Sequence, residues 1–204
     1  MINQTLLKQL GNPPKKMTHD LKKHRRRSIR LKDYDYSQSG AYFITICTYN
    51  KEILFGDIVD SQTHLNKFGW VISEEWLRSI KLRQEIELDE FVIMPNHIHG
   101  IVIIIESNVG ATGRSPLPKG PKPKSIGAFV AGFKSAVTKR INSIHGTPGM
   151  PVWQRNYYEH IIRNERDLDE IRQYIINNPL KWELDTENPK NIKPRGLINQ
   201  TPTK

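Results

Sequence analysis

Two histidines separated by one residue, His97 and His99, have the spacing that most directly indicates chemistry in this sequence. Side chains two positions apart on a β-strand project from the same face, so two imidazoles placed there could bind one divalent cation. The pair follows Pro95-Asn96, a turn candidate, because Pro pre-sets φ at the second turn position and Asn tolerates a positive φ at the third. A packing or surface pair stays open as the alternative, and a metal site would need a third ligand.

A nucleophile and a further ligand are offered later in the chain, by Tyr174 and Asn178. Residues four apart are neighbours on one helix face, and Leu168, Ile171 and Ile175 form an adjoining apolar stripe. A tyrosine hydroxyl can form a covalent intermediate, but with its usual pKa of about 10 it is a poor nucleophile at neutral pH unless it is activated. A metal ion bound to the phosphate would neutralise negative charge and polarise the phosphorus. The alternative is a packing tyrosine and an asparagine that caps a helix.

The elements that must position these residues can be predicted from the periodicity of apolar side chains. Strands are predicted over 41–49, 86–94 and 97–105, an extended segment over 151–162, and helices over 66–82, 125–144 and 164–178. The first six elements in this order match an α+β ferredoxin-like sandwich with an antiparallel sheet. The seventh is an added C-terminal helix that carries Tyr174.

The 204 residues are predicted to comprise a basic, flexible N-terminal arm at 1–32, a domain at 33–182 that carries the candidate catalytic residues, and a polar C-terminal tail at 183–204. The net charge is +10, with +9 in residues 1–32, −7 in 33–106 and +8 in 107–204. Cationic flanks attract polyanions, of which nucleic acid is the commonest, although a solubilising tail is the alternative.

The composition excludes several classes of protein. The single cysteine, Cys47, excludes a disulfide framework and a cysteine-rich zinc site. No apolar run approaches the roughly 20 residues that span a bilayer, and the start of the chain lacks a signal-peptide pattern. We therefore expect a soluble cytoplasmic protein with no membrane partner and no organic cofactor.

Four segments of the sequence resemble the REP-associated tyrosine transposases, which are relatives of the single-tyrosine HUH transposases of small insertion sequences. The segments are RRSIRLKDYDYSQSGAYFITICTY, FVIMPNHIHGIV, GAFVAGFKSAVTKR and VWQRNYYEHIIRNERDLDEIRQYIINNPLKW, and they cover most of residues 25–182. The resemblance implies a metal-dependent endonuclease and strand transferase that acts on single-stranded DNA hairpins of repetitive extragenic palindromes.

The resemblance also implies roles for individual residues. His97 and His99 match the histidines that hold Mg²⁺ or Mn²⁺, and Tyr174 matches the nucleophile that becomes joined to a 5′ phosphate. Asn178 stands where related enzymes place a third ligand, often Gln, and an amide oxygen suits a hard cation. By resemblance a monomer is favoured and a dimer stays open.

Contacts to DNA are expected from basic and aromatic side chains. Tyr157 and Tyr158 are consecutive in an extended segment, so one should face the core and the other a base; Trp153 is expected in the core, and His160 is either structural or a DNA contact. The predicted DNA contacts are Arg25, Arg26, Arg27, Arg30, Lys119, Lys122, Lys124, Arg155 and Tyr158.

Two other functions are compatible with parts of the pattern. A non-catalytic nucleic-acid-binding module of ferredoxin-like fold would use the basic and aromatic residues but would not need the histidines and the tyrosine. A small metal-dependent hydrolase with a water nucleophile would use the histidines and keep its activity without Tyr174. Fold alone does not separate these functions.

Overall fold

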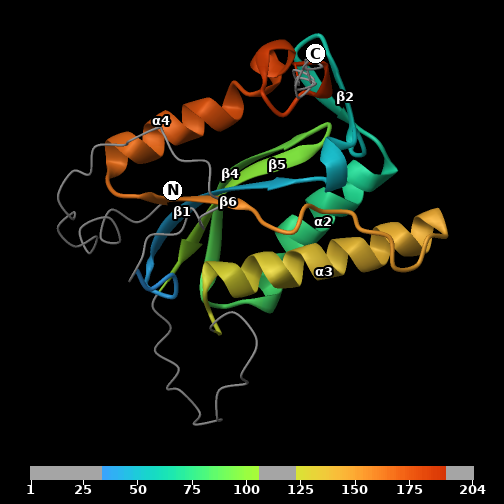
Figure 1. The fold of residues 1–204 in the computed structure, drawn as a ribbon. Helices are drawn as coiled ribbons and strands as arrows, with labels where there is room; N and C mark the ends of the chain where they lie inside the picture. Colours follow the sequence, from blue (N-terminus) through green and yellow to red (C-terminus); the bar gives the residue numbers. More distant parts are fainter. Residues whose placement is uncertain (1–33, 106–122, 192–204) are drawn as a thin grey trace, which may run out of the picture.

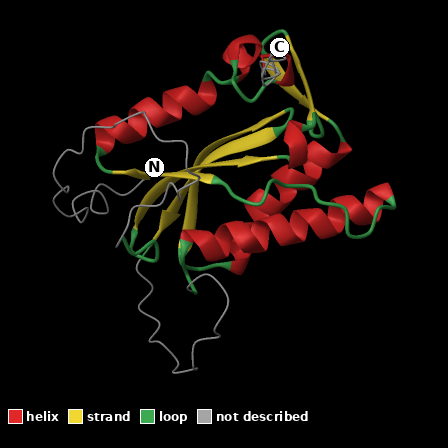
Figure 2. Cartoon of the chain, in the orientation of Figure 1, coloured by secondary structure: helices red, strands yellow, loops and turns green. Residues whose placement is uncertain are grey.

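A computed structural model describes residues 34–105 and 123–191 of the chain. A four-stranded sheet has α2 and α3 on one face and α4 on the other, and a two-stranded hairpin lies outside it (Figures 1 and 2). The elements are β1 (Gly40–Cys47), β2 (Gly56–Val59), β3 (Gln62–Leu65), α2 (Lys67–Leu82), β4 (Ile86–Met94), β5 (His97–Ile104), α3 (Ile126–His145), β6 (Tyr158–Ile162) and α4 (Glu165–Ile176). Short 3₁₀ turns are η1 (Tyr49–Lys51), η2 (Pro179–Leu184) and η3 (Pro189–Asn191).

The strand order is β4-β5-β1-β6, and every neighbouring pair is antiparallel. Along the chain, α2 lies between β1 and β4, and α3 lies between β5 and β6. Together with the strand order, this is the ferredoxin-like arrangement. The predicted α+β sandwich is therefore confirmed, as is the added helix that follows its last strand.

Strand register places the two histidines at one end of the sheet. β5 is a central strand, buried along all eight residues, as its apolar run predicted. Its residue His97 pairs with Cys47 and its residue His99 with Thr45 of β1. Both imidazoles lie where β1 ends and β5 begins, and alternation along the strand turns them toward the same face.

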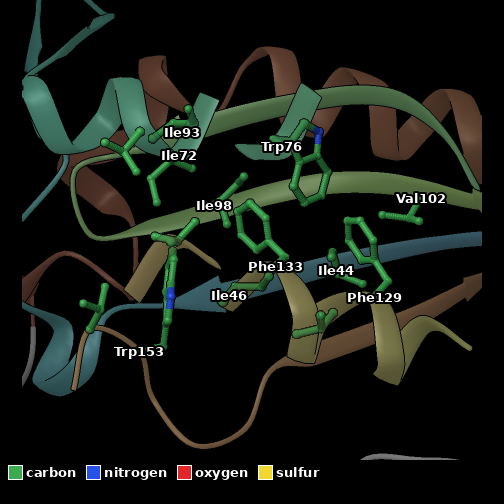
Figure 3. Close-up of a cluster of buried hydrophobic side chains, with 14 of the residues drawn as sticks. Ile44, Ile46, Ile72, Trp76, Ile93, Ile98, Val102, Phe129, Phe133 and Trp153 are labelled. Atoms are coloured by element: carbon green, nitrogen blue, oxygen red, sulfur yellow. The ribbon is translucent and has the colours of Figure 1, made fainter. Parts of the chain in front are cut away.

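The two faces of the sheet carry cores of different size. Trp76 of α2 packs against Phe91, Phe129 and Phe133 in the larger core, beneath α2 and α3 (Figure 3). Trp153, predicted to be a core residue, joins this cluster. The smaller core, beneath α4, consists of Ala41, Phe43, Ile101, Ile103, Ile162, Leu168 and Ile175.

Asparagine caps the helix that carries the tyrosine. The Asn164 side chain accepts a hydrogen bond from the Asp167 amide at 2.9 Å, as predicted for this helix start.

Among the described residues, no helix combines the length and apolar character that a membrane span requires.

The β2–β3 hairpin was not predicted, because its strands are short and polar; its turn residues Asp60 and Ser61 both have positive φ, as a tight hairpin requires. Pro95-Asn96 forms the predicted turn, without a positive φ at Asn96. The Asn96 side chain is buried and hydrogen bonded.

Residues 183–191, which were assigned to a polar tail, lie against the domain. Asn188 is buried and donates a hydrogen bond to the Trp182 carbonyl at 2.9 Å. The Asn96 side chain donates to the Glu187 carbonyl at 2.7 Å. A polar sequence folds here because buried amides, and not apolar side chains, hold it in place.

Candidate functional site

The two histidines face each other through their Nε2 atoms. These atoms are 3.0 Å apart, and both imidazoles are buried. Two nitrogens at about 2.1 Å from one cation, bound at right angles, would also be about 3.0 Å apart. The geometry of the pair therefore fits a shared divalent cation.

Asn96 sets the tautomer of His97. Its Nδ2 donates to the carbonyls of Lys51 and Glu187, at 3.0 and 2.7 Å, so its Oδ1 is the atom 2.8 Å from His97 Nδ1. An amide oxygen only accepts, so His97 carries its proton on Nδ1 and presents a lone pair on Nε2. Asn96 thus prepares His97 as a ligand.

Thr45 plays the corresponding part for His99. Its Oγ1 lies 2.8 Å from His99 Nδ1. A hydroxyl both donates and accepts, so it can support a proton on Nδ1 and leave Nε2 open to a cation. Burial lowers the pKa of His99 to about 3, and it lowers the pKa of His97 well below its usual value. Both imidazoles are neutral near pH 7, which is the form that binds metal.

A carboxylate joins the pair from the segment after α4. Asp185 Oδ2 lies 3.7 Å from His97 Nε2, and the ligand atoms of His97, His99 and Asp185 all lie within 4.8 Å of one another. Sequence reasoning missed Asp185, because it stands in a polar stretch with no ligand spacing to the histidines. Only the packing of residues 183–191 could have identified it.

The segment that carries Asp185 is fastened on several sides. Lys51 Nζ lies 3.2 Å from Glu187 Oε2 and donates to the Thr186 carbonyl at 3.1 Å. The Glu187 amide donates to Asp185 Oδ1 at 2.7 Å, which orients that carboxylate. Burial raises the pKa of Asp185 and outweighs this hydrogen bond.

Tyr174 of α4 lies beside the same histidines. Its hydroxyl is 3.4 Å from His99 Nε2, and its ring packs edge-on against Phe43. Tyr174 remains 42% exposed, unlike the two histidines. Burial and then the charge of Asp185 raise the pKa of Tyr174, while a hydrogen bond from Asn178 opposes the rise. The hydroxyl is therefore protonated near pH 7.

Asn178, the predicted third ligand, is 2% exposed and lies just after α4. Its Oδ1 has no hydrogen-bond partner among the described residues. A buried acceptor without a partner costs about 1–3 kcal/mol, which a bound cation would offset. The Asp185 carboxylate is thus an oxygen donor beside the histidines that the sequence did not indicate.

An open cleft of about 750 Å³ surrounds this group. Its walls come from β1, β6, α4 and residues 185–187, and it contains His99, Tyr174 and Asp185. Tyr158, a predicted DNA contact, is exposed and lines the cleft. Tyr157 also lines it but is half-buried against the larger core. His160 also lines the cleft, and its Nε2 lies 3.2 Å from Asp167.

The other predicted DNA contacts are not gathered at the cleft. Arg155 is exposed in the loop before β6 but does not line the cleft. Lys124 precedes α3, whose Ile126 amide bonds the Tyr36 carbonyl, so it lies near the start of β1 while the histidines lie near its end. Arg25, Arg26, Arg27, Arg30, Lys119 and Lys122 lie outside the described residues.

A second groove, of about 770 Å³, adjoins the cleft between α3 and residues 148–154. Gln154 lines both hollows. Among the described residues that line this groove are Lys134 and Lys139 but no acidic side chain. Lys134 donates to the carbonyls of Gln154 and Asn156 at 2.8 and 2.9 Å, which holds the loop before β6 onto α3.

Comparisons with known proteins give relatives of two kinds. An uncharacterised protein of Haemophilus influenzae is 46% identical over 170 residues, which span 79% of this chain and 92% of that protein. A protein of the same organism, provisionally named a REP-associated tyrosine transposase, is 24% identical over 147 residues, or 72% of this chain and 74% of that protein. No protein-family model matches the chain.

Two solved structures are similar over about three quarters of the chain. One is a REP-associated tyrosine transposase bound to a REP hairpin, with 19% identity, a TM-score of 0.46 and coverage of 75% of this chain and 74% of that one. The other is a provisionally named transposase from Deinococcus radiodurans, with 21% identity, a TM-score of 0.38 and coverage of 74% and 97%. The chain belongs to one family with the uncharacterised Haemophilus influenzae protein, and its resemblance to the REP-associated tyrosine transposases is confirmed.

Proposed function

We propose that this protein cleaves and rejoins single-stranded DNA at hairpins of the REP type, through a covalent bond between Tyr174 and a 5′ phosphate. One observation carries the proposal: the Tyr174 hydroxyl lies 3.4 Å from Nε2 of His99, and His99 forms a buried pair of neutral imidazoles with His97. A packing tyrosine would not need a hydroxyl beside two buried imidazoles, of which His97 is held with its lone pair on Nε2.

The donor set suits Mn²⁺ or Mg²⁺. His97, His99 and Asp185 would hold the ion, with the unpaired Asn178 oxygen as a further donor. Carboxylate and amide oxygens suit both ions, and imidazole favours the transition metal, so we expect Mn²⁺ to bind more tightly. When bound, the ion neutralises charge on the scissile phosphate and polarises its phosphorus.

The remaining chemistry belongs to Tyr174. Its phenolic oxygen attacks phosphorus, a bond from that oxygen to the 5′ phosphate forms, and the bond from phosphorus to the 3′ oxygen breaks. The phenolic proton leaves to solvent in the open cleft, and the departing 3′ oxygen takes up a proton. Attack by a 3′ hydroxyl on the phosphotyrosine reverses these changes and rejoins the DNA without an external energy source.

The cleft and the second groove, which share Gln154 in their walls, would receive the DNA strand. Exposed Tyr158 offers a face on which an unpaired base can stack, beside Tyr174. Lys139 in the second groove is placed to contact a phosphate further along the strand, and the lining of that groove brings no acidic side chain from the described residues to oppose it. The basic residues at 25–30 and 119–124 would add electrostatic attraction.

Labelled hairpin oligonucleotides with single-stranded flanks test the proposal. With Mn²⁺, we expect the wild-type protein to form a DNA adduct that survives denaturation. EDTA and the substitution Tyr174→Phe should each abolish it, whereas Tyr158→Phe, a nearby exposed tyrosine, should retain it. Cleavage that persists in Tyr174→Phe would indicate a water nucleophile, and binding without cleavage would indicate a binding module.

A further inference from the structure

A second feature of α4 has no part in the chemistry above. Arg172 forms a bidentate salt bridge with Asp89 of β4: its Nε donates to Oδ1 at 2.8 Å, and its Nη2 donates to Oδ2 at 2.7 Å. Arg172 also bonds Asp169 of its own helix at 3.2 Å. The Arg172 and Asp89 side chains are 28% and 11% exposed, so solvent screens the pair only in part. The pair joins the tyrosine helix to an edge strand of the sheet.

The sheet is modified at the point where Asp89 meets α4. The register of β4 with β5 shifts between Leu88 and Phe91, which is a β-bulge, and bulges redirect side chains. Asp89 Oδ1 also accepts a hydrogen bond from the Glu90 amide at 2.8 Å. Burial alone would raise the pKa of Asp89, but the hydrogen bonds from Arg172 and Glu90 outweigh it and leave the pKa lowered. The carboxylate is thus held ionised and aimed at the helix.

Arg172 and Tyr174 lie on opposite flanks of α4. Each residue advances about 100° around a helix, so Ile171 and Ile175 define one stripe, with Arg172 and Tyr174 at about 80° on either side of it. Ile171 and Ile175 pack into the smaller core. The ion pair therefore holds one flank of the helix, and the hydroxyl beside His99 extends from the other.

We infer that Arg172 and Asp89 are positioning residues, which set the rotation of α4 and hence the approach of the Tyr174 hydroxyl to His99. Apolar packing is non-directional and tolerates rotation of a helix about its axis. A two-pronged arginine–carboxylate pair is directional and opposes that rotation. At a helix radius of about 5–6 Å, a rotation of about 10° moves a flanking group by about 1 Å. A displacement of that size can reduce a reaction rate about 100-fold.

The inference rests on the proposed function and is tested by Arg172→Lys. Lysine keeps the charge but has no planar fork, so it retains attraction without fixing the angle. At saturating hairpin DNA, we expect adduct formation to slow about 10- to 100-fold while Mn²⁺ affinity stays unchanged. The matched control is Arg166→Lys, on the same helix, whose pair with Glu170 is exposed and should leave the rate unchanged.

A charge exchange separates positioning from a merely structural role. Arg172→Asp should lose adduct formation, and adding Asp89→Arg to it should recover at least tenfold of that loss. An adduct rate of Arg172→Lys within twofold of wild type, or a folded double variant without recovery, would overturn the inference.

The inference can be separated from the proposed function. If the wild-type protein forms no adduct, the proposed function fails, and ¹⁹F NMR of fluorotyrosine-labelled protein then decides the positioning role. The Tyr174 resonance, assigned by its loss in Tyr174→Phe, should shift or broaden in Arg172→Lys and not in Arg166→Lys. An identical resonance in both variants would contradict a positioning role.

Discussion

The two faces of the sheet are covered by different kinds of side chain. Beneath α2 and α3, large aromatic side chains fill a continuous core around Trp76. Beneath α4, the core is smaller, and beyond its edge lie buried polar groups, among them His97, His99 and Asn178. Burial of apolar surface stabilises the first face, whereas hydrogen bonds must compensate the buried polar groups beside the second. The fold thus concentrates apolar burial on one face of the sheet and places its candidate site on the other.

Removing the central aromatic side chain should break the larger core. For Trp76→Ala we expect a loss of about 3–5 kcal/mol in the free energy of unfolding, because the indole is fully buried and leaves a cavity. Urea denaturation measures the loss. The comparison is Trp70→Ala, on the same helix but largely exposed, which should change stability little. Equal losses in the two variants would contradict the picture of a core centred on Trp76.

Acid should destabilise the polar side specifically. Burial lowers the folded pKa of His99 to about 3 and that of His97 well below its usual value. The unfolded chain then binds more protons below about pH 6.5, so stability falls as pH falls through that value toward 3. Between pH 6.5 and 5.5, each histidine contributes a loss of up to about 1.4 kcal/mol.

Thermal unfolding in EDTA from pH 7 to 4.5 measures this dependence. We expect a shallower pH dependence in His99→Gln, which removes one buried imidazole. His145→Gln, an exposed histidine at the end of α3, should leave the slope as it is. An unchanged slope in His99→Gln would show that the imidazole is not held neutral by the fold.

Thr45 offers the smallest and most selective change. Thr45→Val keeps the shape but removes the hydroxyl 2.8 Å from His99 Nδ1. Loss of a hydrogen bond behind a ligating histidine typically weakens metal affinity about 10- to 100-fold. Mn²⁺ titration calorimetry measures the effect, with Thr48→Val as the control, because the hydroxyl of that buried threonine donates to the Glu52 carbonyl and not to a histidine. Equal Mn²⁺ affinities in the two variants would remove Thr45 from the metal site.

Regular elements could be predicted because their signals are local. Apolar spacing along 66–82 and 125–144 predicted α2 and α3 within a residue or two, and Asn164 predicted the start of α4. The alternation rule placed His97 and His99 on one face of a strand. These features depend on residues that are near neighbours in the sequence.

Asp185 and the Arg172–Asp89 pair could not be predicted in this way. Asp185 lies beside His97 although 88 positions separate them in the sequence. The segment that carries Asp185 is held by the side chains of Asn96 and Lys51, which donate to the backbone carbonyls of Glu187 and Thr186. Asp89 is aimed by a bulge whose position depends on pairing with β5. A periodic pattern of apolar residues does not identify a polar residue whose contacts form only when a distant segment packs beside it.

The helices, the strands of the four-stranded sheet and the placement of two imidazoles on one strand face could be predicted from the sequence, because propensity and periodicity act over a few residues. Only the tertiary structure decided that the tyrosine hydroxyl lies beside His99 and that an aspartate joins the histidines. Those contacts depend on how α4 and the segment after it pack onto the sheet, and packing combines many weak interactions between residues far apart in the chain.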